Sequence, residues 1–158
     1  FHMGSLDDST LVARKLASRK SVVCATPDYF KKHGAPTTPD ELLQYNCLLF
    51  MQGKHLSQWE FVAEDGEVLS VAVTGNFHAT STQLLKSAAL NHVGIIMLPE
   101  YLVTQELKAH QLQAVLREYD TRHVDIYALY AQTRHLPRRA RLLLDFAVER
   151  FNSDHYWS

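Results

Sequence analysis

The chain has 158 residues, of which 46% are hydrophobic and 21% are charged, and its formal net charge is −1. This length suits one domain with enough apolar residues for a core, and a near-neutral charge provides no general attraction for nucleic acid. The longest apolar run, Val93–Leu98, contains a glycine and is far shorter than the roughly 20 residues of a membrane helix. Two cysteines, Cys24 and Cys47, exclude a disulfide scaffold. We therefore expect a globular, cytoplasmic protein.

The first residues differ in character from the rest. Residues 1–5, Phe-His-Met-Gly-Ser, have neither the basic start nor the apolar stretch of a signal peptide and are typical of a vector-derived tag remnant. A structured-looking segment then starts at Leu6 without an initiating methionine of its own. This pattern predicts a fragment of a longer protein.

Strands and helices alternate in the first part of the chain. Residues 11–16 and 21–26 have the composition of strands, and the second stretch is almost free of charge, as in a strand buried on both faces. Residues 27–34 predict a short helix, with a proline at its start and a glycine at its end. A second helix is expected over 39–45, capped by Thr38. Its apolar face would consist of Leu42, Leu43 and Tyr45.

The middle of the chain changes to the two-residue period of strands. Residues 47–50, 59–63 and 68–73 fit strands, and Asp65-Gly66 between the last two is a strong hairpin signal. A short strand through Phe77 then leads into a helix. One stripe of this helix is expected to carry Leu84, Leu85, Ala88 and Ala89.

The last part of the chain continues the alternation. Residues 93–98, 112–115 and 125–131 predict strands, and Pro99 and Pro137 each open a helix. The first of these helices carries Tyr101, Leu102 and Leu107, and the last one has Leu143, Phe146, Ala147 and Phe151 at helical spacing. Strands that alternate with helices, interrupted by an antiparallel hairpin, predict an α/β fold.

Catalytic and metal-binding patterns are not found in the sequence. The nine histidines include no pair three to five residues apart on one predicted helix, and there is no HExxH motif. Cys24 and Cys47 lie in apolar strands, where a thiol is usually inert, and there is no GxSxG elbow. The acidic residues around Asp65 fit a solvated hairpin tip. We expect no metal, no cofactor and no enzyme activity.

Three consecutive hydroxyl residues are the best candidate for a binding site. Thr80, Ser81 and Thr82 lie between the end of a predicted strand and the start of a helix. Their hydroxyls and the free N–H groups of the first helical turn could bind a carboxylate or another small anion. Ligands of α/β sheets also bind at the carboxyl ends of strands. Simple N-capping by Ser81 or Thr80 explains the pattern equally well.

A basic group surrounds the start of the last helix. Its members are Arg134, His135, Arg138, Arg139 and Arg141. Because cations at a helix N-terminus oppose the helix dipole, helix stability does not explain them. A solvated face is one explanation, and contact with an anion or a partner is the other.

Several short motifs occur in a characteristic order. They are His33-Gly34-x-Pro36-x-x-Pro39-x-x-Leu42, Trp59-x-Phe61 before Asp65-Gly66, Gly94-Ile95-x-x-Leu98-Pro99, and Asp125–Tyr130 before Arg134-His135-Leu136-Pro137. This ordered set, over residues 6–151, resembles the effector-binding domain of LysR-type transcriptional regulators. The resemblance implies a two-lobed fold similar to type 2 periplasmic binding proteins.

The resemblance also implies a division of the chain into lobes. Residues 6–20 would end lobe I, residues 21–130 would form lobe II with a hinge strand at each end, and residues 131–158 would return to the C-terminal helix of lobe I. The family's N-terminal winged helix-turn-helix and the first half of lobe I would be absent from this chain. DNA would then be bound only through that absent domain.

The family's cleft-facing loop corresponds to Ala79, Thr80, Ser81 and Thr82. The resemblance therefore implies a small effector, an anion by the chemistry of the hydroxyls, that binds between the lobes and changes their arrangement. It also implies a cytoplasmic homo-oligomer. A periplasmic solute-binding protein of the same fold is the alternative interpretation.

Overall fold

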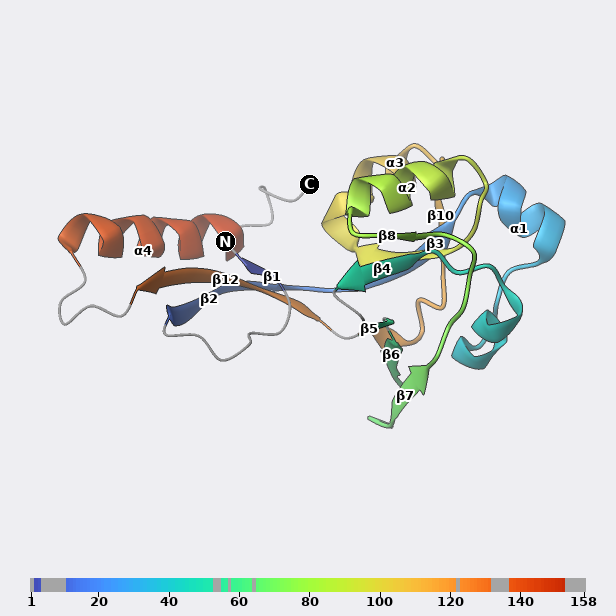
Figure 1. Ribbon diagram of the computed structural model, residues 1–158, viewed down its shortest axis with the longest axis horizontal. Coiled ribbons are helices and arrows are strands. Elements are labelled where there is room, and N and C mark those ends of the chain that lie inside the picture. Colours follow the sequence, from blue (N-terminus) through green and yellow to red (C-terminus); the bar gives the residue numbers. More distant parts are fainter. Residues whose placement is uncertain are drawn as a thin grey trace. The chain divides into compact units, whose positions relative to one another are not determined.

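The computed structural model describes residues 2–3, 11–52, 55–56, 58–63, 65–121, 123–131 and 137–152. The chain forms two compact units, which are described separately here (Figure 1). The larger unit is Lys20–Arg122, and the smaller unit combines Phe1–Arg19 with His123–Ser158. In the described part of the chain, no helix is long and apolar enough to cross a membrane.

The larger unit is built on a mixed sheet. Its strand order is β8, β4, β9, β3, β10, where a parallel bridge between Cys47 and Ile95 joins the β4 and β9 sides. The strands are β3 (Ser21–Ala25), β4 (Leu49–Gln52), β8 (His78–Ala79), β9 (Ile96–Pro99) and β10 (Gln113–Val115). β4 is parallel to β8, whereas β3 is antiparallel to both of its neighbours. The short strand β5 (His55–Leu56) pairs with the end of β4.

Both faces of this sheet are covered. Helices α2 (Thr82–Leu90) and α3 (Thr104–Lys108) cover one face, where the buried residues include Val22, Cys24, Leu48, Leu85, Ile96 and Val103. The core on the other face includes Val23, Ala25, Tyr29, Phe30, Trp59 and Phe61. Consecutive β3 residues thus point into different cores, which confirms that β3 is buried on both faces.

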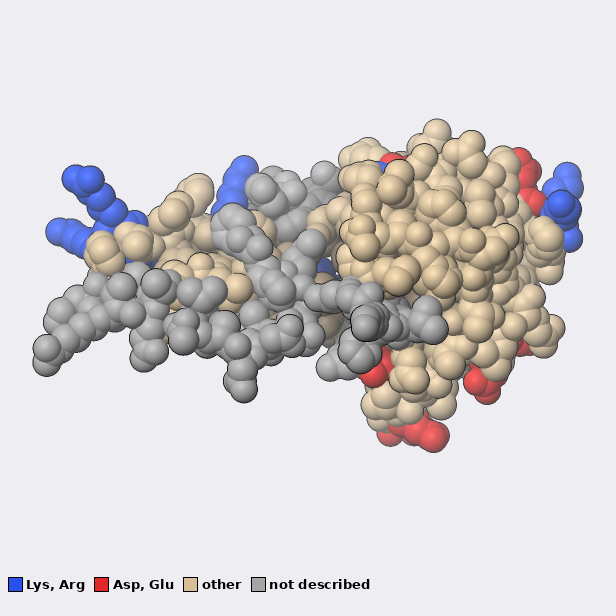
Figure 2. All heavy atoms as spheres, viewed as in Figure 1, with Lys and Arg blue, Asp and Glu red and all other residues tan. Residues whose placement is uncertain are grey.

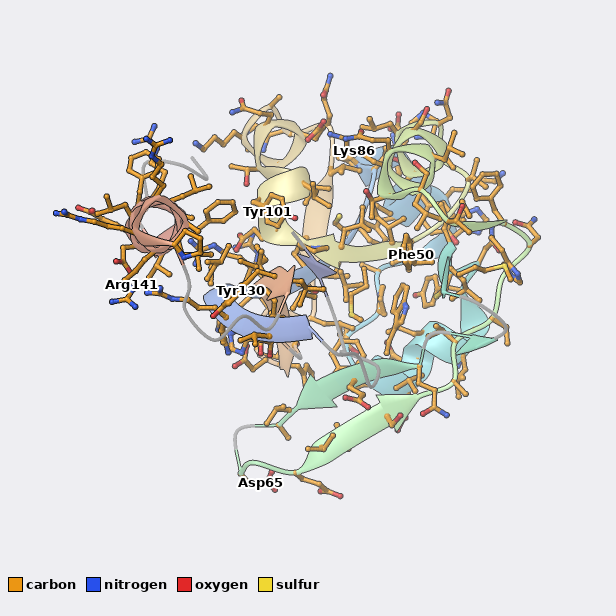
Figure 3. The ribbon with its side chains drawn as sticks, turned by 60° about the vertical axis from the view of Figure 1, so that its left-hand side comes forward. Phe50, Asp65, Lys86, Tyr101, Tyr130 and Arg141 are labelled. Atoms are coloured by element: carbon orange, nitrogen blue, oxygen red, sulfur yellow. The ribbon has the colours of Figure 1, made fainter. Side chains whose placement is uncertain are left out.

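The predicted hairpin is confirmed. Strands β6 (Trp59–Val62) and β7 (Val68–Val71) pair antiparallel, and β11 (Asp120–Thr121) pairs with the other edge of β6. Gly66 has φ +87°, a conformation that favours glycine, and the Glu67 N–H donates to the Asp65 carboxylate at 3.0 Å. Acidic side chains lie together at this tip, as Figure 2 shows in red, and Figure 3 labels Asp65 there.

The first predicted helix is confirmed and the second needs a correction. Helix α1 (Pro27–His33) is capped by the Thr26 side chain and ends at Gly34. The segment after it is a 3₁₀ helix, η1 (Pro39–Gln44), and the Thr38 side chain makes no capping hydrogen bond. The expectation of an apolar face with Leu43 is also wrong, because Leu43 is 55% exposed whereas Leu42 is buried. A 3₁₀ helix has three residues per turn, so its faces do not follow the α-helical spacing.

The helix predicted after Pro99 is divided into two short pieces. Residues Glu100–Leu102 form a 3₁₀ helix, η2, and α3 follows. In α2, Leu85 and Ala89 are buried as predicted, but Leu84 is 56% exposed. The prediction that Leu84 belongs to the buried face of this helix is therefore wrong.

The smaller unit is a sheet covered by one helix. The sheet has the order β1, β12, β2, with β1 (His2–Met3), β2 (Leu11–Arg19) and β12 (Val124–Ala131). Helix α4 (Arg138–Asn152) packs on it, and the core consists of Leu16, Ala17, Ile126, Ala128 and Ala147. Residues 2 and 3, expected to be vector-derived, pair here with Tyr127 and Ile126.

The apolar face predicted for the last helix is partly wrong. Ala147 is buried and Phe151 is partly buried, but Leu143 and Phe146 are 66% and 62% exposed. The residues that contact the core with Ala147 are Leu144, Val148 and Phe151. An ion pair from Arg14 to Asp145, at 2.7 Å, also joins β2 to this face of α4.

Candidate functional site

The hydroxyl segment Ala79–Thr82 follows two parallel strands. Leu49 lies opposite His78 and Phe50 lies opposite Ala79, so β4 and β8 have their carboxyl ends at the same edge of the sheet. Figure 3 labels Phe50, the β4 residue that lies opposite Ala79. Ala79 is buried, and Thr80 is exposed where β8 ends. The structure therefore places the segment at the kind of edge where α/β proteins bind ligands.

Capping explains one of the three hydroxyls. Ser81 is the N-cap of α2, and its side chain accepts a hydrogen bond from the Leu84 N–H at 3.5 Å. Within the described residues, no hydrogen bond is recorded for the hydroxyls of Thr80 and Thr82. The first turn of α2 carries no acidic residue. The capping interpretation is therefore confirmed for Ser81, and ligand binding by the segment stays a prediction.

Helix α2 is held in place from its middle. The Lys86 ammonium donates to the Glu106 carboxylate at 2.7 Å and to the Leu102 carbonyl at 3.0 Å. Figure 3 shows Lys86 between α2 and α3. Both side chains are mostly buried, and the pair joins α2 to the segment that follows β9. This ion pair was not evident from the sequence, because Lys86 and Glu106 are 20 positions apart.

The basic group predicted around the start of the last helix belongs to the smaller unit. Arg138, Arg139 and Arg141 are exposed at the start of α4, in agreement with a solvated face. Arg134 and His135 lie outside the described residues. Among the residues described, no group of three or more His, Cys, Asp or Glu side chains is arranged to hold a metal ion.

The two thiols are buried, and we expect them to be unreactive. Cys24 and Cys47 are both 0% exposed, and burial raises the pKa of each thiol to about 12. Only the thiolate reacts as a nucleophile, and at pH 8 about one thiol in ten thousand would be ionised. Alkylation by iodoacetamide, followed by mass spectrometry, should be at least about 100-fold slower for the native chain than for the chain in urea. Fast labelling of either cysteine without denaturant would contradict this.

The family of the chain follows from comparison with known proteins. The family model of the LysR substrate binding domain matches residues 1–152. The chain belongs to this family, and its mixed α/β architecture is that of a type 2 periplasmic-binding-protein-like fold. The fold class expected from the sequence is therefore confirmed.

The relatives are transcriptional regulators. The HTH-type transcriptional regulator CrgA of Neisseria meningitidis is 32% identical over 152 residues, which are 96% of this chain and 50% of CrgA. The CrgA regulatory domain has a TM-score of 0.71 at 30% identity, over 94% of this chain and 72% of that domain. The full-length structure of the virulence activator AphB of Vibrio cholerae matches this chain with a TM-score of 0.75 at 30% sequence identity, over 94% of this chain and 50% of AphB.

These comparisons decide two of the earlier expectations. The chain belongs to the LysR substrate binding domain family, and its relatives named above are transcriptional regulators and not enzymes. The alternative of a periplasmic solute-binding protein is not favoured by any of these relatives. The chain spans about half the length of the curated relatives that it matches.

Proposed function

We propose that this chain senses a small anionic effector, and that Ala79, Thr80, Ser81 and Thr82 contact it. The observation that supports this is the position of the segment, at the shared carboxyl edge of β4 and β8 and at the N-terminus of α2. A carboxylate at this place would accept hydrogen bonds from hydroxyl groups and from the first N–H groups of the helix. The positive end of the helix dipole would further favour an anion.

Two features of α2 fit it for this role. No acidic side chain in its first turn competes for the N–H groups. The Lys86–Glu106 ion pair and the buried side chains of Leu85 and Ala89 hold the helix on the sheet, so its N-terminus is a fixed binding element. A preorganised site loses less entropy on binding than a mobile one does.

The names of the relatives support a role for the chain within a longer protein. We propose that residues 21–130 form the second lobe with its hinge strands, and that residues 6–20 and 131–158 belong to the first lobe. The effector would bind between the lobes and shift a balance between two arrangements. The full-length protein would be a cytoplasmic homo-oligomer that binds DNA through an N-terminal helix-turn-helix domain, in line with the HTH-type names of its relatives.

A double substitution tests the effector site. Changing Thr80→Val and Ser81→Ala in the full-length regulator should weaken the response to its effector about ten-fold or more, because hydrogen bonds to a charged ligand are lost. The measurement is the effector concentration that gives half of the maximal reporter response. DNA affinity, measured by fluorescence anisotropy, should stay the same.

A matched control has the same two changes elsewhere. Thr74→Val with Ser87→Ala removes two exposed hydroxyls outside the segment and should leave the response unchanged. Loss of the Ser81 cap costs about 1 kcal/mol of stability, so the unfolding free energy of both variants is measured as well. An unchanged effector response in the Thr80 and Ser81 variant would refute the proposed site.

A further inference from the structure

A separate pocket lies where the chain enters and leaves the larger unit. Lys20 and Ser21 begin this unit, and Asp120 and Thr121 end its described part. The pocket beside them has a volume of about 340 Å³. Its lining consists of Lys20–Val23, Glu100 and Val115–Thr121. None of the residues 79–82 borders it, so this is not the site proposed above.

Two polar contacts join the entering and leaving segments. The buried Thr121 hydroxyl accepts a hydrogen bond from the Ser21 N–H at 3.0 Å and donates to the Ser21 carbonyl at 2.7 Å. The Lys20 ammonium lies 2.9 Å from the Asp120 carboxylate. The first and the last described residues of the larger unit are therefore joined to each other beside the pocket.

The loop between β10 and β11 also lines the pocket. Leu116 is buried and has φ +56°, a left-handed conformation that is rare for a bulky side chain. The Tyr119 N–H donates to the Leu116 carbonyl at 3.2 Å, and the Tyr119 ring meets the buried Phe61 ring edge to face. Such backbone strain persists only where the surrounding structure enforces it, and it is concentrated at functional sites.

The charges of the lining have both signs. Lys20 and Arg117 are cationic, whereas Glu100, Glu118 and Asp120 are anionic. With three carboxylates and two cations, the lining disfavours a ligand that carries only negative charge. The hydroxyl segment, in contrast, was proposed to bind such a ligand. The apolar residues of the lining are Val22, Val23, Val115 and Leu116, and Val115 is the one among them whose side chain is not fully buried.

We propose that this pocket binds an α-amino acid with an apolar side chain. Arg117 or Lys20 would bind its carboxylate, Glu118 or Glu100 would bind its ammonium group, and Val115 would contact its side chain. The volume lies in the range of small-molecule sites. Because Lys20 is bonded to Asp120, such a ligand would compete for the ion pair between the entering and leaving segments. Binding would thereby act on the two connections of the larger unit.

Nitrogen-15 NMR titration of the 158-residue chain with L-leucine tests this proposal. The expected result is saturable shifts of the amide signals of residues 20–23, 100 and 115–121. Two analogues, 3-methylbutylamine without the carboxylate and 4-methylpentanoate without the amine, should each bind about ten-fold or more weakly, since each lacks one charged contact.

Substitutions at exposed positions complete the test. Arg117→Gln and Glu118→Gln should each weaken L-leucine binding about ten-fold, whereas Lys31→Gln, at another exposed position on α1, should not. The proposal is overturned if L-leucine causes no shifts at millimolar concentrations, or if its shifts lie at residues 79–82. Equal binding of the three compounds, or an unchanged affinity in both pocket variants, would also overturn it. Failure of L-leucine to bind at this pocket would leave the anionic effector at Thr80 untouched, because that proposal is tested by the reporter response.

Discussion

Gly94→Ala is expected to destabilise the larger unit by about 3 kcal/mol, because the new methyl group has no space. A Cβ atom at Gly94 would lie 2.2 Å from the Asn46 backbone oxygen and 2.8 Å from a methyl carbon of Leu48. The Asn46 oxygen cannot move away freely, since it accepts the Ile95 N–H at 2.9 Å in the region that joins β4 to β9. Urea unfolding, followed by circular dichroism and tryptophan fluorescence, measures the loss.

Gly66→Ala is the matched control for this experiment. A Cβ atom at Gly66 has no neighbour within 4 Å, and only its φ of +87° opposes the change. The expected cost is about 1 kcal/mol, the strain of an alanine in the left-handed conformation. If both variants lost the same stability, steric exclusion at Gly94 would not be the reason for its glycine.

Lys86→Met is expected to cost about 2 kcal/mol, a value between those of exposed and buried ion pairs. The change leaves the mostly buried Glu106 carboxylate without its cation and removes a donor from the Leu102 carbonyl. Lys20→Met is the control, because its ion pair with Asp120 is about half exposed and should contribute less than about 1 kcal/mol. Equal effects of the two variants in urea unfolding would contradict a special role for the α2–α3 pair.

The same pair makes a pH-dependent contribution. Burial alone would raise the pKa of the Glu106 carboxyl, but the hydrogen bond and charge of Lys86, with a backbone hydrogen bond, bring this pKa below its ordinary 4.5. Stabilisation by an ionised carboxylate is complete above the unfolded-state pKa and disappears as the pH falls through the lower folded-state pKa. The stability difference between the native sequence and Glu106→Gln should therefore shrink below about pH 4.5.

The candidate sites differ in how far the sequence could reveal them. Ala79–Thr82 is continuous in the chain, so its hydroxyls and its place between a strand and a helix can be recognised from the residues alone. The pocket beside Lys20 cannot be recognised in this way. Its contacts join residues 100 positions apart, such as Ser21 and Thr121, and no local pattern indicates that these positions meet.

Local patterns in the sequence determined the elements that local chemistry controls. The turn at Gly66, the end of α1 at Gly34 and the charge-free strand β3 depend on backbone conformation and composition within a few residues. Only the tertiary structure decided which side of a helix is buried. Leu84 and Leu85 are both leucines and are adjacent in the chain, yet Leu84 is exposed and Leu85 is buried, because Leu85 packs into the core between α2 and the sheet. Leu143 and Ala147 of α4 differ for the same reason: burial depends on the surface that a helix meets, and that surface comes from distant parts of the chain.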